Sequence, residues 1–233
     1  MQKTDAIVFI KKDSERLPGK NFLNFNGRPL FTVILQTLQH HPLIDKILID
    51  SNADEVFTYI EQNIPKAVAI KRPAHLLGGH ISANQLIAYD LQFSQNNHFF
   101  QTHCTNPLLT SATITRALNR YYEMLPTNDS LFSVIRIQNR FFNEHGNPTN
   151  HTSGEVKRLQ DLEPVFMENA SFFIFSKESF KAASDNRIGL KPGLYPISAI
   201  EGTDIDFEVD FILASVIEKN GQMFPDVFTV TKG

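Results

Sequence analysis

Tryptophan is absent from this 233-residue sequence, and there is a single cysteine, Cys104. One cysteine excludes a disulfide bond within the chain. A basic excess is also missing, because 22 Lys and Arg stand against 25 Asp and Glu and the formal net charge is -3. Proteins that coat nucleic acid or anionic membranes normally carry such an excess, so we expect neither partner and infer that any anion site is local.

Long hydrophobic runs, internal repeats and linkers rich in Pro, Gly and Ser are missing as well. The first residues, "MQKTDAIVFIKKD", contain too short an apolar run for a signal peptide or a membrane-spanning helix, so we expect a cytoplasmic protein. Because 42% of the residues are hydrophobic, the chain can bury a core and is not expected to be disordered. We therefore expect one domain over residues 1–233.

Short apolar runs alternate with longer stretches of helical period, which predicts parallel strands joined by crossover helices. The predicted strands of this series cover residues 6–10, 46–51, 67–71, 98–103 and 130–137. The predicted helices cover residues 30–41, 53–64, 82–93 and 111–125. Ser51 and Asn52 are expected to cap the second helix, and Pro65 is expected to end it.

The alternation stops after residue 137. Residues 138–170 have neither a helical nor a strand period and are rich in Asn, Gly, His and Thr, which predicts an extended arm or a pair of hairpins. A strand is expected again at 171–175. The segment 203–220 begins with acids and continues at helical spacing, so we interpret it as a strand end that leads into a C-terminal helix.

The segment after the first predicted strand, "KKDSERLPGKN" (11–21), carries more cations than its own acids can neutralise. In an open parallel sheet, ligands bind beyond the carboxyl ends of the strands. Glycine allows the backbone to approach an anion closely, and Pro18 stiffens the turn. The segment is not a Walker loop, since Ser14 and Asn21 stand where that motif needs Gly and Ser or Thr. It indicates a polyphosphate site, with a solvated loop of ordinary surface lysines as the alternative.

Six short motifs, spread over nearly the whole chain, occur in the order of one known family. "SERLPGKNFLNFNGRPL" resembles the family signature, and "SNADEV" stands where the family has an STD-like strand end. "RPAHLLGG" matches an RPxxL element, and "HCTNPLLTSATI" matches a PTSPL turn with its following helix. "ENASFFIF" parallels an NGAIYI strand, and "GTDIDFEVDF" is close to a DIDTEEDF box. The chain thus resembles a divergent member of the acylneuraminate cytidylyltransferases, or CMP-sialic acid synthetases.

The resemblance implies a three-layer, Rossmann-like nucleotidyltransferase fold with a mostly parallel central sheet. It implies Mg²⁺-dependent transfer of CMP from CTP to a sialic-acid-like sugar acid, with release of pyrophosphate, in lipopolysaccharide or capsule assembly. It further implies a homodimer, with residues 138–170 as an inserted arm that serves both dimerisation and acceptor binding.

The resemblance assigns the triphosphate of CTP to the first loop. Lys20 and Arg16 suit the phosphates and the catalytic neutralisation of charge, because cytidylyl transfer requires positioning and electrostatic stabilisation rather than covalent chemistry. Ser14 and Asn21 are expected to donate hydrogen bonds, and Lys11 adds a further cation.

Asp204 and Asp206 alternate around Ile205, so in an extended strand both carboxylates project to one face, where they repel unless a cation joins them. Oxygen ligands favour Mg²⁺, which needs only one or two carboxylates plus substrate phosphates. The alternative from the residues alone is that Thr203 or Asp206 caps the C-terminal helix, with Asp210 in its first turn. The resemblance favours metal binding by Asp204 and Asp206, and makes Asp206 catalytic.

The base and the acceptor are expected to meet residues of the later motifs. Arg72 suits the base or the ribose, and His103 stands where the family has a Gln, unless a short gap brings Gln101 there. The acceptor is expected to contact Asn169, Arg158, Gln160 and Asp161. The identity of the sugar acid stays open among N-acetylneuraminate, legionaminate, pseudaminate and octulosonate.

The sequence also departs from the family. Lys11 replaces an Arg, Glu15 stands where a Lys is common, and Gly79 replaces an Asp. An anion at position 15 would repel a triphosphate, so we expect Glu15 to point away and pair with Lys12. Two alternatives follow: a nucleotidyltransferase with another acceptor or base, such as the octulosonate type, or a nucleotide-binding homologue that has lost catalysis. Zinc and thiol chemistry are not expected, since the histidines lack metal spacing and Cys104 lacks an evident His and acid partner.

Overall fold

The computed structural model of the protein describes residues 3–154 and 157–221. Its strands are β1 (Thr4–Ile10), β2 (Asn24–Phe25), β3 (Arg28–Pro29), β4 (Ile44–Ser51), β5 (Ala67–Lys71), β6 (His98–His103), β7 (Ser130–Ile137), β8 (Val165–Ser176) and β9 (Pro192–Ile197). Its α-helices are α1 (Leu30–His40), α2 (Asp54–Asn63), α3 (Ala83–Asp90), α4 (Ser111–Met124), α5 (Lys177–Ala182) and α6 (Glu208–Asn220). The 3₁₀ turns are η1 (Lys20–Phe22), η2 (Ala74–Leu76), η3 (Leu91–Phe93) and η4 (Leu159–Asp161).

The central sheet has seven strands in the order β5-β4-β1-β6-β8-β7-β9, and β2 and β3 form a separate small hairpin. β8 is antiparallel to both of its neighbours, whereas the other pairs of the sheet are parallel. The chain leaves β1 on one side toward β4 and β5, and later returns on the other side of β1 as β6. The strand order therefore reverses between β1 and β6, and the crevice at such a reversal is where open α/β sheets bind ligands.

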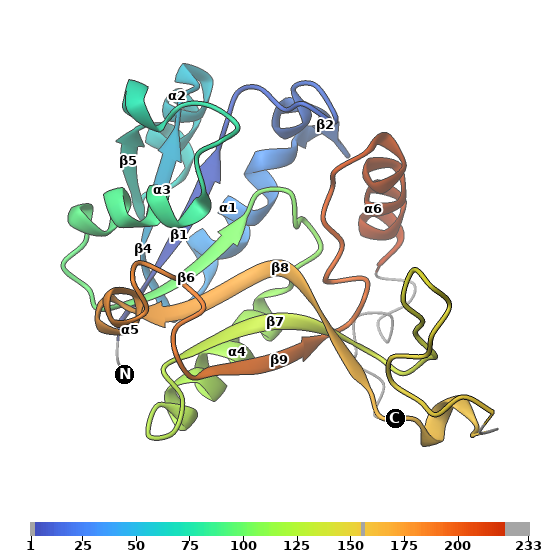
Figure 1. The fold of residues 1–233 in the computed structure, drawn as a ribbon. Coiled ribbons are helices and arrows are strands. Elements are labelled where there is room, and N and C mark those ends of the chain that lie inside the picture. Colours follow the sequence, from blue (N-terminus) through green and yellow to red (C-terminus); the bar gives the residue numbers. More distant parts are fainter. Residues whose placement is uncertain (1–2, 155–156, 222–233) are drawn as a thin grey trace.

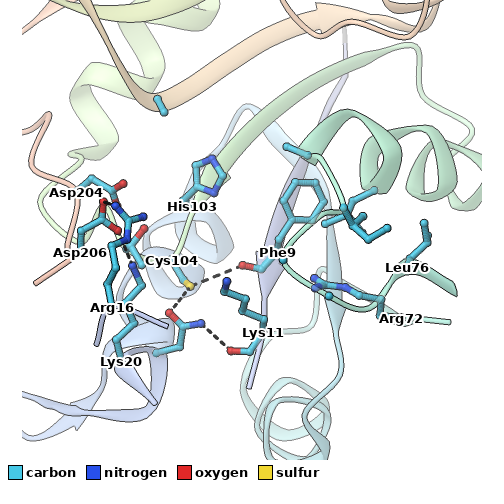
Figure 2. A pocket seen from close by; sticks show the side chains of 18 residues that line it. Phe9, Lys11, Arg16, Lys20, Arg72, Leu76, His103, Cys104, Asp204 and Asp206 are labelled. Carbon is cyan, nitrogen blue, oxygen red and sulfur yellow. Dashed lines mark hydrogen bonds and ion pairs between the residues drawn. The ribbon is translucent and has the colours of Figure 1, made fainter. Parts of the chain in front are cut away.

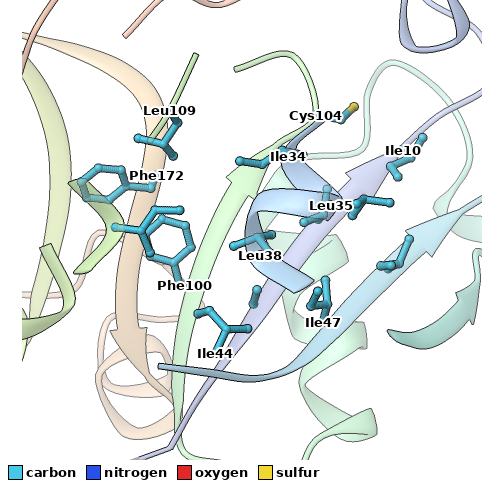
Figure 3. Close-up of a cluster of buried hydrophobic side chains, with 14 of the residues drawn as sticks. Ile10, Ile34, Leu35, Leu38, Ile44, Ile47, Phe100, Cys104, Leu109 and Phe172 are labelled. Atoms are coloured by element: carbon cyan, nitrogen blue, oxygen red, sulfur yellow. The ribbon is translucent and has the colours of Figure 1, made fainter. Parts of the chain in front are cut away.

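Helices cover both faces of this sheet, as Figure 1 shows. Apolar residues of α1, α2 and α4 pack on one face, and those of α3 and α5 pack on the other. The strands alternate accordingly: Phe100 and Phe172 face the α1 side, whereas Phe99 and Phe173 face the α3 side. Figure 3 shows Leu35 and other α1 residues packed onto the strands. The prediction of a three-layer α/β fold with a mostly parallel sheet is confirmed.

The five strands of the predicted β/α series are present, and β5, β6 and β7 have the predicted bounds. The structure adds the hairpin β2–β3, the short helix α5 and the edge strand β9, which the sequence reasoning missed. β9 begins and ends around prolines, "PGLYPI", and a strand with two prolines and a glycine does not show the usual strand composition. At the edge of the sheet, however, the missing N–H groups are tolerated.

Two local predictions are wrong. Ser51 and Asn52 do not cap α2: the residue at its N-cap is Ala53, the Ser51 hydroxyl accepts a hydrogen bond from the Ala53 N–H, and Asn52 accepts one from the Lys12 N–H. The segment 203–206 is not a strand but an irregular stretch before α6.

The predicted arm differs from the structure at its C-terminal end. Residues 165–170 belong to β8 and pair with the end of β7, from Val134 to Ile137, so this part has a backbone ladder. The register of the pair shifts between Phe132 and Val134, beside Ala170, which has a φ of 54°. The described remainder, 138–154 and 157–164, is irregular apart from η4 and one bridge between Phe142 and Pro148. In Figure 1 the arm extends away from the sheet.

Within the ranges that the structure covers, none of the helices combines the length and the apolar character needed to cross a bilayer.

Candidate active site

A cavity of about 380 Å³ opens at the carboxyl ends of β1 and β6, next to the reversal of strand order. Phe9 of β1 lies opposite His103 of β6, and Ile10 lies opposite Ser51 of β4, so these strands end on neighbouring rungs. The volume lies within the range of small-molecule sites. Of the residues predicted to bind nucleotide or metal, those that line the cavity are Lys11, Arg16, Lys20, Asn21, Arg72, His103, Asp204 and Asp206. Figure 2 shows how they are arranged.

The first loop is held in shape by its own backbone and by Asn21. Gly19 has a φ of 64°, a left-handed conformation that glycine adopts without strain, and the chain then enters η1. The Asn21 amide donates to the Lys11 carbonyl at 2.8 Å and accepts from the Cys104 thiol at 3.2 Å. Asn21 is nearly fully buried, so its main contacts brace the loop.

Lys20, Arg16 and Asp206 form a charge cluster on one side of the cavity. Lys20 Nζ lies 2.9 Å from Asp206 Oδ1 and donates to the Ile205 carbonyl at 2.5 Å. Arg16 Nη1 lies 2.6 Å from Asp206 Oδ2. In the parts of the chain that the structure describes, Lys11 has no ion pair. With Arg72 of the opposite side, four cations line the cavity against two carboxylates, Asp204 and Asp206, and the surplus of positive charge suits an anion.

The environment of the Asp204 carboxyl group indicates whether the site could bind a metal ion. Its Oδ1 is buried and has no hydrogen-bond partner among the described residues. Burial, with a smaller effect of the neighbouring Asp206, raises the pKa of the Asp204 carboxyl above its ordinary value, although a hydrogen bond from Thr105 opposes this. A carboxylate oxygen that lacks a donor beside a second carboxylate fits Mg²⁺, which takes one or two protein carboxylates and keeps several waters. Within the described residues there is no group of three or more His, Cys, Asp or Glu that could hold a metal by themselves.

The segment that carries the two acids is fixed by Ile205. Its side chain is fully buried, and its N–H donates to the Thr105 carbonyl at 2.9 Å. Capping of α6 falls to Asp210, whose Oδ2 accepts from the N–H groups of Asp206 and Phe207 at 3.1 and 2.8 Å. The alternative that Thr203 or Asp206 caps this helix is therefore wrong, and the Asp206 side chain is left to the cavity.

Arg72 lines the opposite side of the cavity and is anchored from behind. Its Nε lies 2.7 Å from Oδ1 of the fully buried Asp50. Asp90 of α3 is also fully buried. If both acids were ionised, three buried oxygens would lack a hydrogen-bond donor within the described residues: both carboxylate oxygens of Asp90 and Oδ2 of Asp50. Burial and the charge of Asp50 raise the pKa of Asp90 to about 9. Asp90 is thus protonated at neutral pH, and that proton supplies a hydrogen bond to Asp50.

The sequence reasoning missed this acid pair behind Arg72. A signal was present, because Asp90 falls on the apolar face of its helix, in phase with Leu86 and Ile87. An acid at such a position is rarely buried without a partner.

His103 and Cys104 lie between the two sides of the cavity (Figure 2). Burial, together with the charges of Arg187 and Lys20, lowers the pKa of His103 to about 3, so its ring is neutral. Gln101 is fully buried and does not line the cavity, so of the two candidates only His103 reaches it. Burial raises the pKa of Cys104 to about 12, which agrees with the expectation that this thiol is not a nucleophile.

The other predicted residues are not brought to the cavity of the same chain. The Ser14 hydroxyl is buried, without a partner in the described residues, but it is not part of the lining. Asn169 accepts from the Ser133 hydroxyl at 2.6 Å at the base of the arm. Arg158 and Asp161 pair with each other at the surface of the arm, with 2.8 Å between Nε and Oδ2. Gln160, between them, is also exposed.

Two of the departures from the family pattern meet in space. Glu15 does not pair with Lys12, as we expected: Lys12 Nζ lies 2.9 Å from Glu55. Instead, Glu15 Oε1 lies where a side chain at position 79 would start, only 2.7 Å from a Cβ built on Gly79. Position 79 therefore accommodates Glu15 because it has no side chain of its own.

A family model described as cytidylyltransferase matches residues 6–215. The chain is 25% identical over 236 residues to the post-translational flagellin modification protein B of Campylobacter coli, covering 95% of this chain and 98% of that one. It is 24% identical over 221 residues to an N-acylneuraminate cytidylyltransferase of Streptococcus agalactiae, covering 90% of this chain but only 52% of the relative. The chain therefore spans about half the length of that streptococcal enzyme. It is 24% identical over 191 residues to a pseudaminic acid cytidylyltransferase of Campylobacter jejuni, covering 76% of this chain and 80% of that one.

A solved structure of CMP-2-keto-3-deoxy-manno-octonic acid synthetase in complex with CTP superposes with a TM-score of 0.70. It covers 94% of this chain and 100% of the other, at 10% sequence identity. At this identity the likeness concerns the fold, which is that of a nucleotidyltransferase.

Proposed function

Because this chain belongs to the cytidylyltransferase family, and is therefore a nucleotidyltransferase, we propose that it transfers CMP from CTP to a sialic-acid-like sugar acid and releases pyrophosphate. The observation that carries this proposal is the charge cluster of Lys20, Arg16 and Asp206, which lies with Lys11 in one cavity at the end of β1 and β6. The names of the relatives, N-acylneuraminate and pseudaminic acid cytidylyltransferase, support this class of acceptor.

In the proposed reaction a hydroxyl oxygen of the acceptor bonds to the α-phosphorus of CTP, and the bond from this phosphorus to the bridging oxygen of pyrophosphate breaks. The hydroxyl proton leaves with solvent or a phosphate oxygen. Lys20 and Arg16 would neutralise the charge that builds up on the departing pyrophosphate, which is the main task of a protein in phosphoryl-type transfer. Their present partner, Asp206, holds both cations at the cavity wall before the nucleotide binds.

Asp204 and Asp206 would hold Mg²⁺, since the unpartnered Asp204 Oδ1 provides a free ligand atom beside the second carboxylate. When bound, the ion supplies positive charge to the phosphate oxygens. The charge balance favours metal binding, because CTP brings more negative charge than the surplus of four cations over two carboxylates in the cavity neutralises.

The residues on the other side would bind the nucleoside. Arg72 cannot swing freely, because Asp50 holds its Nε, so its guanidinium offers the remaining N–H groups in a fixed direction. The acceptor would be met by Arg158, Gln160 and Asp161 on the arm of a second copy, since none of these lines the cavity of its own chain, and by Asn169 of the same chain, whose neighbour Ala170 borders the cavity.

The experiment is a matrix of nucleotides and sugar acids with the purified protein. CTP, UTP, ATP and GTP are each combined with N-acetylneuraminate, legionaminate, pseudaminate and 3-deoxy-manno-octulosonate, and both pyrophosphate and the nucleotide-sugar product are measured with Mg²⁺ and with EDTA. We expect product with CTP and one of the nine-carbon acids, and none with EDTA. Activity with octulosonate alone, or with another nucleotide, would refute the proposed acceptor or base, and binding of CTP without product in any combination would refute catalysis.

A further inference from the structure

A line of three polar side chains leads from the protein interior to the cavity and ends at His103. It starts at Arg187, in the segment after α5, whose guanidinium carbon lies 3.7 Å from the centre of the Phe173 ring. Arg187 Nη1 donates to Gln101 Oε1 at 2.6 Å. Gln101 Nε2 in turn lies 3.2 Å from His103 Nε2. Neither Arg187 nor Gln101 lines the cavity, whereas His103 does.

The hydrogen bonds fix which way round the Gln101 amide lies. Its Oε1 faces the guanidinium of Arg187, which can only donate. Its Nε2 faces the Thr102 carbonyl at 3.0 Å, which can only accept. A flipped amide would place two donors together at Arg187 and two acceptors together at Thr102. The atom that faces His103 is therefore the amide nitrogen, with one hydrogen left to donate.

The orientation of Gln101 decides where His103 carries its proton. A nitrogen that receives a hydrogen bond from the amide must present a lone pair, so Nε2 is the acceptor and the proton of the neutral ring is on Nδ1. The ring is neutral because burial and the charges of Arg187 and Lys20 lower the pKa of His103 to about 3, against a weaker opposite effect of Asp206. Within the described residues, Nδ1 has no hydrogen-bond partner, and the ring borders the cavity (Figure 2).

We propose that Arg187 and Gln101 are positioning residues that hold His103 as the Nδ1–H tautomer, and that His103 offers this N–H to an acceptor atom of the bound pyrimidine, O2 or N3 of cytosine. The ligand part rests on the proposed use of CTP, whereas the tautomer part concerns the protein alone. In this arrangement a single histidine donates one hydrogen bond of fixed direction, and the buried Gln101 acts through it without touching the base.

The first test reads the tautomer without nucleotide. The ¹⁵N chemical shifts of His103 in ¹⁵N-histidine-labelled protein, assigned with His103→Gln, are expected to show a protonated Nδ1 and an unprotonated Nε2 at pH 7. A protonated Nε2 in the unmodified protein would overturn the proposal without reference to any activity.

The second test reverses the hydrogen bond between Gln101 and His103 by an isosteric substitution. The hydrogen bonds from Arg187 to Gln101 and from Gln101 to His103 are called the relay. In Gln101→Glu the carboxylate keeps the contact with Arg187 but presents an oxygen to His103 Nε2, which must then carry a proton. We expect the ¹⁵N shifts to report a protonated Nε2 and the dissociation constant for CTP, measured by calorimetry, to rise about tenfold or more, because one base acceptor loses its donor. The matched control is Gln92→Glu, the same change at an exposed position of η3.

The outcomes separate the two parts. An inverted tautomer with unchanged CTP affinity would refute the proposed contact between His103 and the base, but would support the proposal that Gln101 sets the tautomer. An unchanged tautomer in Gln101→Glu would overturn the relay. If Gln101→Glu does not fold, Arg187→Lys is measured instead, and a mixed tautomer population is expected because a lysine cannot hold the amide with the fixed geometry of a guanidinium.

Discussion

Asp90 is the residue whose charge state the fold changes most plainly. Its carboxyl is fully buried, and burial together with Asp50 raises its pKa to about 9 from an ordinary value of 3.8. Because the pKa is higher in the folded than in the unfolded chain, its contribution to stability is complete below pH 4 and is lost as the pH rises toward 9. The proton on Asp90 thus stabilises the anchor of Arg72 under neutral conditions.

We therefore predict that Asp90→Asn gains stability relative to the unmodified protein as the pH rises. Asparagine is neutral at every pH and can still donate to Asp50, so the variant escapes the cost of ionisation. The difference in free energy of unfolding, from urea titrations at pH 5 and pH 8.5, should change by at least about 1 kcal/mol in favour of the variant. Asp185→Asn, at an exposed acid paired with Lys181, is the control. The same difference at both pH values would contradict a protonated Asp90.

The two acids at the cavity lead to a second prediction at this scale. Asp204→Asn and Asp206→Asn should each reduce turnover at least about 100-fold while leaving the urea midpoint within about 0.5 M, because the amide keeps the shape but not the charge that would hold Mg²⁺ under the proposed function. Asp206→Asn should also weaken CTP binding less than it slows turnover, since Lys20 and Arg16 are released from their ion pairs to bind phosphate. Near-normal turnover of both variants at saturating Mg²⁺ would refute the proposal that Asp204 and Asp206 bind the metal.

At the scale of elements, the first loop and the loop from Gly78 to Ile81 are matched to each other. Both contribute to the cavity, and Glu15 of the first occupies the space above Gly79 of the second. Glu15 Oε1 is the end of a flexible side chain, so a side chain at position 79 could displace it without a backbone shift. The charges of the two positions, rather than their volumes, should then decide whether they are compatible.

This pairing predicts a double-mutant cycle. Gly79→Asp should raise the KM for CTP, because a second acid beside Glu15 repels the triphosphate, and Glu15→Lys alone should lower it. The double variant should have a higher free energy of unfolding than the sum of the single effects predicts, since the introduced lysine and the introduced aspartate attract each other, with a coupling of about 0.5–1 kcal/mol at low salt. Additive effects, or a coupling that does not weaken at high salt, would show that the two side chains do not interact.

The helices and strands also show how much of the fold could be predicted from the sequence. Strands β5, β6 and β7 were predicted to the residue, because a buried parallel strand is a short apolar run between turn signals. The order of the six motifs placed Lys20, Arg16, Asp204 and Asp206 in one site, because that order already implies the fold of the resembling family. By contrast, the ion pair of Asp206 with Lys20 bridges 186 positions of sequence, and no local pattern reports such a contact.

What the sequence could not supply were contacts between buried polar groups of distant elements. Arg187 and Gln101 are 86 positions apart, and Asp50 and Asp90 belong to a strand and a helix that are not consecutive. The position of Asp90 on the apolar face of its helix indicates that it is buried, but the sequence does not show which group it contacts. The acceptor role of Arg158 and Asp161 stays a prediction, because the arm that carries them leads away from the cavity of its own chain.

For the whole molecule, the arm and α6 raise the question of a partner. Large apolar side chains are exposed on both: Phe142, Val165, Phe166 and Met167 on the arm, and Phe207, Val209, Ile212, Leu213 and Val216 on or next to α6. In Figure 1 both elements lie on the right-hand side of the molecule. Leu162 of the arm, in contrast, is already buried within the chain, and Val156 lies outside the described residues. An apolar surface shared by two elements is typical of an interface.

We propose that this surface pairs with the same surface of a second copy, because a two-fold axis covers an apolar patch with itself. Arg158, Gln160 and Asp161 give an independent reason, since they lie exposed on the arm and not at the cavity of their own chain, and a second copy could bring them to a cavity. A stable pair would bury about 800 Å² on each copy.

The corresponding prediction is that Phe142→Asp combined with Phe166→Asp yields a monomer in sedimentation at micromolar concentration, where the unmodified protein sediments as a dimer. Two carboxylates from each copy, four in the interface, cost several kcal/mol, enough to raise the dissociation constant at least about 100-fold. The monomer should bind CTP within about threefold of the dimer, because the cavity belongs to one chain, yet turn over the sugar acid at least about tenfold more slowly. Leu190→Asp, at a position 66% exposed outside both elements, is the matched control and should leave the dimer intact. If the unmodified protein sediments as a fully active monomer, the arm neither assembles the molecule nor completes a partner's site, and the acceptor residues must be sought around the cavity itself.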